Sequence, residues 1–195
     1  MPPKSKLVND NNWEKDFIIY SFPEIRLEKD EKGEWKKKAV GLLKEWQKLV
    51  KSNINPDHNC KALLTGEKSK VLVLDFDLKT EEDEKKWKSY HNKYGLSQTP
   101  CVRTKRGYHY YFLWKEKLSQ LPSKFDGFID IQGNGKQVYY PGTKYYDEEN
   151  KQWFTYSWFE DSNNIKSLMQ MPEDLFNDLM TASQPKQAPL HKPAS

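Results

Sequence analysis

The chain has 195 residues, of which 14% are aromatic and 31% are charged, and its formal net charge at pH 7 is +4. This length is enough for one large domain with its own core, and the mild positive charge permits nucleic acid or a nucleotide as a partner without requiring either. Cys60 and Cys101 form no CxxC motif, which argues against a zinc site or a disulfide framework and fits a reducing, intracellular setting. No apolar run reaches membrane length and the first residues lack a hydrophobic signal segment, so we expect a soluble protein with no membrane partner.

In chain order, the sequence first predicts a small N-terminal unit that combines strands with one helix. Residues 17–20 form a short apolar run typical of a strand, and residues 24–40 have the pattern of a hairpin that turns at Lys32 and Gly33. Apolar residues recur at helical spacing between residues 39 and 51, which predicts an amphipathic helix.

The rest of the chain alternates strand patterns with two helices. Residues 61–66 and 70–77 are predicted to form a hairpin, and Thr80 with Asp83 makes a capping-box pattern for a helix that ends at Gly95. The remaining predicted elements are strands over residues 100–104, 108–114, 128–133, 137–142 and 152–158, and a last helix opened by Pro172, Glu173 and Asp174.

The segment VLVLDFD, residues 71–77, runs from four strand-forming residues directly into Asp75 and Asp77. Alternate residues of a strand share a face, so both carboxylates project to the same side, opposite Leu72 and Leu74. Two neighbouring carboxylates repel each other unless water, basic groups or a divalent cation compensates their charge, and Mg²⁺ and Mn²⁺ prefer such oxygen ligands. A strand that simply ends in solvated acids is the alternative interpretation of this segment by itself.

Two further strands carry a polar residue where a core position is expected. His109 alternates with apolar and aromatic residues on its strand, and Asp130 lies between Ile129 and Ile131. If these strands are neighbours of residues 71–77 in one sheet, Asp75, Asp77 and Asp130 can surround two metal ions roughly 3.5 to 4 Å apart. That arrangement serves in-line phosphoryl or nucleotidyl transfer.

The series VLVLDFD, RGYHYYF and FIDIQGNGKQVYYPGTKY resembles the three motifs of archaeo-eukaryotic primases, in particular the primase-polymerase domains of viral and plasmid replicative helicase-primases. The resemblance implies an α/β (α+β) fold: a catalytic core with an RNA-recognition-like sheet and helices on one side, joined to a smaller N-terminal α/β unit. It also implies a DNA primase/polymerase that adds nucleotides from NTPs or dNTPs on a single-stranded DNA template, with Mg²⁺ or Mn²⁺ as the cofactor.

By the same resemblance, Asp75, Asp77 and Asp130 hold the metal ions, His109 contacts the nucleotide phosphates, and Gly107 is the small residue that precedes the histidine. Other polar residues are weaker candidates for phosphate or nucleotide contact, and an ordinary turn explains them about as well. These weaker candidates are Arg103, Lys105 and Arg106 in one turn, and Thr143 and Lys144 in another.

Aromatic and basic residues elsewhere also fit nucleic-acid contact. Trp35 with residues 36–38 could stack and pair with nucleic acid, although a charged helix entrance explains them better. Tyr139, Tyr140, Tyr145 and Tyr146 fit a template platform, although aromatic residues on strands are more often core.

The sequence predicts three segments: a flexible N-terminus over residues 1–12, the catalytic domain over 13–182, and a proline-containing linker over 183–195. The resemblance implies that this linker leads to a helicase domain in the same full-length chain. Two other functions stay open. One is a metal-dependent nuclease, which needs similar acids but a hydrolytic water. The other is an inactive RNA-recognition-like module that binds nucleic acid.

Overall fold

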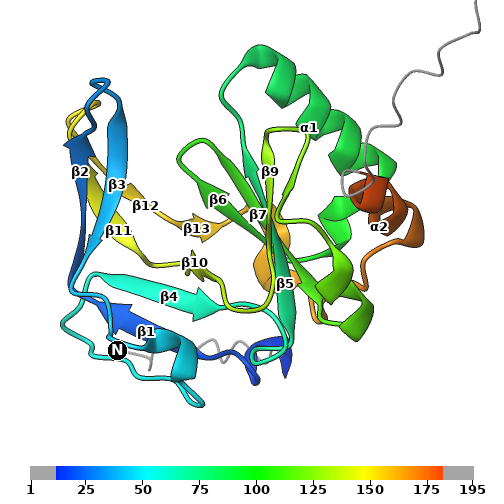
Figure 1. Cartoon of the computed structure of the whole chain (residues 1–195), viewed down its shortest axis with the longest axis horizontal. Coiled ribbons are helices and arrows are strands. Elements are labelled where there is room, and N and C mark those ends of the chain that lie inside the picture. The colour runs from blue at the N-terminus through cyan, green and yellow to red at the C-terminus, as the bar shows by residue number, and fades with distance from the viewer. Residues whose placement is uncertain (1–11, 182–195) are drawn as a thin grey trace, which may run out of the picture.

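A six-stranded antiparallel sheet forms the centre of the protein in the computed structural model, which describes residues 12–181 (Figure 1). Its strand order is β13-β6-β7-β5-β9-β8. The strands are β5 (Val71–Asp77), β6 (Cys101–Thr104), β7 (Gly107–Leu113), β8 (Lys124–Phe125), β9 (Ile129–Gln132) and β13 (Ser157–Trp158).

The inner four strands of this sheet have the order β6-β7-β5-β9. Helix α1 (Glu81–Lys93) connects β5 to β6, and the 3-10 helix η4 (Glu116–Gln120) lies between β7 and β9. This is the strand order of an RNA-recognition-like sheet, with its second helix reduced to a 3-10 turn. The α/β fold class predicted from the sequence is confirmed.

The two faces of the sheet belong to two hydrophobic cores, because successive side chains of a strand point to opposite sides. Leu72, Leu74 and Phe76 of β5 pack in one core with residues of α1 and of α2 (Glu173–Met180). Val71 and Val73 pack in the other core, against a second sheet. The predicted division of β5 into two faces is therefore confirmed, and Asp75 and Asp77 lie on the face without helices.

Helix α1 begins where the sequence predicts. Thr80 Oγ1 accepts a hydrogen bond from the Asp83 amide at 3.1 Å, and Asp83 Oδ2 accepts one from the Thr80 amide at 3.2 Å, which completes the capping box. After the helix the chain turns at Gly95, whose φ is 62°, into the 3-10 helix η3 (Leu96–Gln98).

The second core is closed by a three-stranded sheet and two hairpins that stand beside it (Figure 1). The sheet has the order β1-β4-β10, and β2 pairs with β3 and β11 with β12. The strands are β1 (Ile19–Phe22), β2 (Glu24–Lys29), β3 (Trp35–Val40), β4 (Cys60–Leu64), β10 (Gln137–Tyr139), β11 (Lys144–Asp147) and β12 (Gln152–Thr155). The hairpin predicted over residues 24–40 is confirmed, whereas strand β11 is not predicted by the sequence pattern.

The helix predicted between residues 39 and 51 is wrong. In the described part of the chain this segment contains only the 3-10 helix η2 (Trp46–Lys48), because Gly41 and Glu45 have positive φ angles of 73° and 57° that interrupt any α-helix. Its apolar residues do not form one buried stripe either, since Leu42 is 39% and Val50 82% exposed. The N-terminal unit is thus built from strands and 3-10 turns, which also include η1 (Asn12–Glu14).

Two strand connections in the structure differ from those that the sequence predicts. Residues 60–64 and 71–77 are joined by a tight turn with one bridge, Gly66 to Val71, but β4 and β5 then enter different sheets instead of forming a hairpin. The strand predicted over residues 152–158 divides at the buried Tyr156, so that β12 joins a hairpin and β13 joins the central sheet before the 3-10 helix η5 (Glu160–Asn164). In each case the hydrophobic pattern predicts the strand correctly, while tertiary packing selects its partner.

The flexible segment predicted over residues 1–12 lies outside the described residues, except for Asn12 in η1, and so does the linker predicted over 183–195. Within residues 12–181, no helix has the length and apolar character needed to cross a membrane.

Replacing Gly107 by alanine should strongly destabilise the central sheet. Gly107 pairs with Asp77, and a Cβ atom at this position would lie 1.7 Å from the carbonyl oxygen of Phe76, so the backbones of β5 and β7 would have to separate. We expect the free energy of unfolding in urea to fall by about 3 kcal/mol or more. The matched control is Gly133→Ala, whose new Cβ meets only Trp114 at an ordinary 3.7 Å. Equal stability of the two variants would contradict the prediction.

Candidate active site

The polar residues of β5, β7 and β9 meet at one level of the central sheet. Asp75 of β5 lies directly opposite His109 of β7 on one side and opposite Asp130 of β9 on the other. Asp77, two residues further along β5, shares the face of Asp75. The structure therefore brings together the three acids and the histidine that the sequence nominates.

Asp75 and His109 form the most enclosed pair of the site. His109 Nε2 lies 3.3 Å from Asp75 Oδ1, while His109 is only 5% exposed and its Nδ1 has no hydrogen-bond partner in the described residues. Burial by itself would raise the pKa of Asp75, but the neighbouring His109, with further help from Lys37 and Arg106, outweighs burial and lowers that pKa. Asp75 is thus held as a carboxylate, and His109 keeps hydrogen-bonding capacity that the protein does not use.

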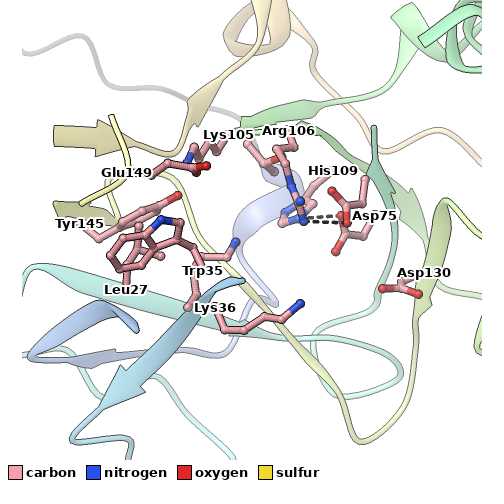
Figure 2. A pocket seen from close by; sticks show the side chains of 13 residues that line it. Leu27, Trp35, Lys36, Asp75, Lys105, Arg106, His109, Asp130, Tyr145 and Glu149 are labelled. Carbon is pink, nitrogen blue, oxygen red and sulfur yellow. Dashed lines mark hydrogen bonds and ion pairs between the residues drawn. The ribbon is translucent and has the colours of Figure 1, made fainter. Parts of the chain in front are cut away.

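These residues line a cavity of about 280 Å³ between the central sheet and the two hairpins. Figure 2 shows its two ends: Asp75, His109 and Asp130 lie on one side, and Leu27, Trp35 and Tyr145 gather on the other. One end is therefore acidic and hydrogen-bonding, and the other is apolar and aromatic. The full lining is Leu27, Trp35, Lys36, Lys37, Asp75, Asp77, Thr104, Lys105, Arg106, His109, Asp130, Tyr145 and Glu149.

Basic side chains offset the charge of the other two acids. Arg106 Nη2 lies 3.0 Å from Asp77 Oδ2 and Lys79 Nζ lies 3.8 Å from the same oxygen, while Lys124 Nζ lies 3.8 Å from Asp130 Oδ1. No three His, Cys, Asp or Glu side chains among the described residues are close enough together to form a metal-binding cluster as they stand. The donor set still fits Mg²⁺ or Mn²⁺ chemically, because three carboxylates on neighbouring strands share one face and one cavity.

Lys105 joins the β6–β7 turn to the β11–β12 hairpin. Its Nζ lies 2.8 Å from Asp147 Oδ2 and 3.2 Å from Glu149 Oε2, and the Asp147 side chain is almost completely buried. Asp147 Oδ1 also accepts hydrogen bonds from the amides of Glu149 and Asn150, at 3.1 and 3.3 Å. Lys105, predicted as a phosphate ligand, does line the cavity, but two carboxylates already hold its ammonium.

The other predicted nucleotide contacts divide between the cavity and its surroundings. Arg106 lines the cavity and pairs with Asp77. The guanidinium carbon of Arg103 instead lies 5.9 Å from the ring centroid of Tyr108, on the helix-covered face of the sheet. Thr143 is fully buried and exchanges hydrogen bonds with the backbone of Lys61, and Lys144 lies over the exposed ring of Trp153. Arg103, Thr143 and Lys144 therefore lie outside this cavity.

Sequence reasoning misses part of the lining, above all the wall contributed by the hairpins. It does not single out Leu27, Thr104 and Glu149, and it favours a helix entrance for residues 35–38, which form strand β3. Tyr145 belongs to both the core and the cavity wall. Trp35, Lys37 and Ala39 alternate along one face of β3, and this strand pattern could have predicted that β3 contributes to a wall of the site.

Comparison with protein families assigns the chain to a known family. Residues 26–174 match the Prim-Pol family, described as the N-terminal domain of bifunctional DNA primase/polymerase. The match spans most of the chain, from within β2 through β3 and the central sheet to the start of α2. The chain therefore belongs to the Prim-Pol family, which makes it a DNA primase/polymerase domain at the family level. A search of curated proteins found no match.

Asp147→Asn should reduce the dependence of stability on acid pH. Burial would raise the pKa of Asp147, but hydrogen bonds from Lys105 and Asn150 outweigh it and lower that pKa in the folded state. The associated stability is complete above the ordinary aspartate pKa of about 3.9 and is lost as the pH falls below it. The stability difference between wild type and Asp147→Asn, measured in urea, should therefore be largest at pH 7 and shrink towards pH 3.

Glu148→Gln provides the control for that experiment. Glu148 forms an exposed pair with Lys151 at 3.0 Å in the same turn, and such surface pairs contribute little. A stability difference for Asp147→Asn that stays constant between pH 7 and pH 3 would show that the Asp147 carboxylate is not held as described.

Proposed function

We propose that this chain catalyses template-directed nucleotidyl transfer from NTPs or dNTPs, making or extending primers on single-stranded DNA. The observation that carries the proposal is the register of β5, which sets Asp75 level with both His109 and Asp130 at one end of a single cavity. Membership of the Prim-Pol family supports the same reaction class.

Asp75, Asp77 and Asp130 are the residues that would hold Mg²⁺ or Mn²⁺. When bound, such ions supply charge neutralisation for the triphosphate and activation of the primer 3′-hydroxyl. The three carboxylates come from two adjacent strands of a rigid sheet, so they approach a bound nucleotide from one side. In the protein itself, His109 lies beside Asp75, Arg106 pairs with Asp77, and Lys124 lies beside Asp130.

His109 and Arg106 are the groups of this wall that would bind phosphate oxygens. His109 offers ring nitrogens that have few partners in the protein, and Arg106 is a partly exposed guanidinium at the cavity rim. Charge-assisted hydrogen bonds of this kind are about twice as strong as neutral ones and carry orientation. Phosphates bound here would lie beside the acids.

The apolar end of the cavity would receive a base of the nucleotide or template. Trp35 and Tyr145 present aromatic surface there, and Leu27 lies beside them (Figure 2). Stacking on aromatic side chains contributes about 1–3 kcal/mol per base and tolerates any base, as template-directed synthesis requires.

Asp75→Ala should abolish most nucleotide incorporation. The change removes one ligand of the proposed metal site together with the transition-state stabilisation that depends on it, so we expect a loss on the order of 10³-fold in a primer-extension assay with labelled dNTPs and Mn²⁺. Glu82→Ala, an exposed acid on α1, is the control and should retain wild-type activity. An active Asp75→Ala protein would rule out the proposed mechanism.

His109→Ala should weaken nucleotide binding while metal binding persists. Loss of a charge-assisted phosphate contact predicts at least about tenfold weaker dNTP affinity in calorimetry. His58→Ala, in the N-terminal unit, should leave affinity unchanged. If His109→Ala lowers the melting temperature but leaves nucleotide affinity intact, the histidine has a structural role only.

A further inference from the structure

Strand β3 carries three consecutive lysines whose surroundings differ. All three are exposed residues, but Lys36 Nζ lies 3.0 Å from Glu34 and Lys38 Nζ lies 3.6 Å from Glu28, both within the β2–β3 hairpin. Lys37 projects from the opposite face of the strand and has no carboxylate within 4.0 Å among the described residues. Lys37 is therefore a cation that the protein does not pair with an acid.

The Lys37 side chain is nevertheless held in place. Its Nζ donates a hydrogen bond of 2.7 Å to the Tyr156 hydroxyl and lies 5.5 and 5.4 Å from the ring centroids of Tyr139 and Tyr156. Tyr156 is fully buried, and its backbone exchanges hydrogen bonds with Gly142 and Thr143. A lysine that is anchored by aromatic rings and one hydroxyl keeps two of its three donors for another partner.

Lys37 lines the cavity that contains Asp75, Asp77 and His109. Desolvation in this concave site lowers the pKa of Lys37, although the charges of Asp75 and Asp77 act in the opposite direction. Because β3 belongs to the hairpin wall and the acids belong to the central sheet, Lys37 faces the site from the side opposite β5. An anion in the cavity would contact both walls.

We propose that Lys37 binds a phosphate group of the incoming nucleoside triphosphate and positions it against the wall formed by Asp75 and His109. This inference rests on the proposed function, and it adds a binding residue from outside the three motifs. An ammonium is a compact point charge suited to phosphate, and its Tyr156 anchor fixes its position before the nucleotide arrives. Because Lys37 lines the same cavity as Asp75 and His109, a phosphate bound by Lys37 would lie beside the residues proposed to hold the nucleotide.

The test compares Lys37→Met, Lys37→Arg and the matched control Lys38→Met. Each protein is titrated with dATP and Mn²⁺, with inorganic triphosphate, and separately with single-stranded DNA, and steady-state incorporation is measured in parallel. We expect Lys37→Met to weaken dATP and inorganic triphosphate binding at least tenfold and to raise KM more than it lowers kcat. Lys37→Arg should recover most of the affinity, Lys38→Met should match wild type, and DNA binding should be unchanged in all three.

Tyr156→Phe keeps the ring and removes only the hydroxyl that anchors Lys37. It should weaken triphosphate binding, but by less than Lys37→Met does. This variant therefore tests the inference even if Lys37→Met fails to fold. If folded Lys37→Met binds triphosphate with wild-type affinity, the role of Lys37 is overturned and the proposed function still stands. If Lys37→Met does not fold, wild-type affinity in Tyr156→Phe leads to the same conclusion. Selective loss of DNA binding would assign the contact to the nucleic-acid backbone instead. A wild-type protein that neither binds dATP nor incorporates it would overturn the proposed function itself.

Discussion

The double pairing of β5 is the constraint on which the candidate site depends. Hydrogen bonds to β7 on one side and β9 on the other set Asp75 level with His109 and Asp130. Both faces of β5 are buried over residues 71–74, so the leucines and valines do not fix the register by themselves. A slip of one residue would bury Asp75 and Asp77 in the core beneath the helices and turn Phe76 towards the cavity, and the cost of burying two carboxylates opposes that slip.

Charge balance links the site to its surroundings. Each of the three aspartates of the cavity has a basic neighbour, namely His109 for Asp75, Arg106 for Asp77 and Lys124 for Asp130, whereas Lys37 has only a hydroxyl and aromatic rings. Lys37 is therefore the cationic side chain of this cavity that no carboxylate of the described residues holds within 4.0 Å. Lys105, by contrast, is held as a structural connection by the buried Asp147 and by Glu149.

Local pattern is sufficient to predict α1 and the inner strands β5, β6, β7 and β9 of the central sheet. The alternation in residues 71–77 and the Thr80 capping box are properties of neighbouring residues, and the order of the three polar motifs groups Asp75, His109 and Asp130 from the amino-acid sequence alone. Partner choice is not predictable in this way. Gly41 and Glu45 interrupt the expected helix through their positive φ angles, and Tyr156 divides one apolar run between two sheets whose partner strands are distant in sequence. The sequence does not single out Lys37 as a site residue, because Tyr156, which anchors its side chain, lies 119 positions away along the chain.

The two walls of the cavity are held by different backbone hydrogen-bond ladders. The acidic wall is the middle of a six-stranded ladder, whereas β2 and β3 form a ladder only with each other in the part of the chain that the structure describes. Moving the hairpin outward would break side-chain contacts, such as that between Lys37 and Tyr156, but no backbone hydrogen bond of the central sheet. Among the described residues, the hairpin thus meets the acidic wall through side chains, whereas Asp75, His109 and Asp130 belong to one continuous hydrogen-bonded sheet.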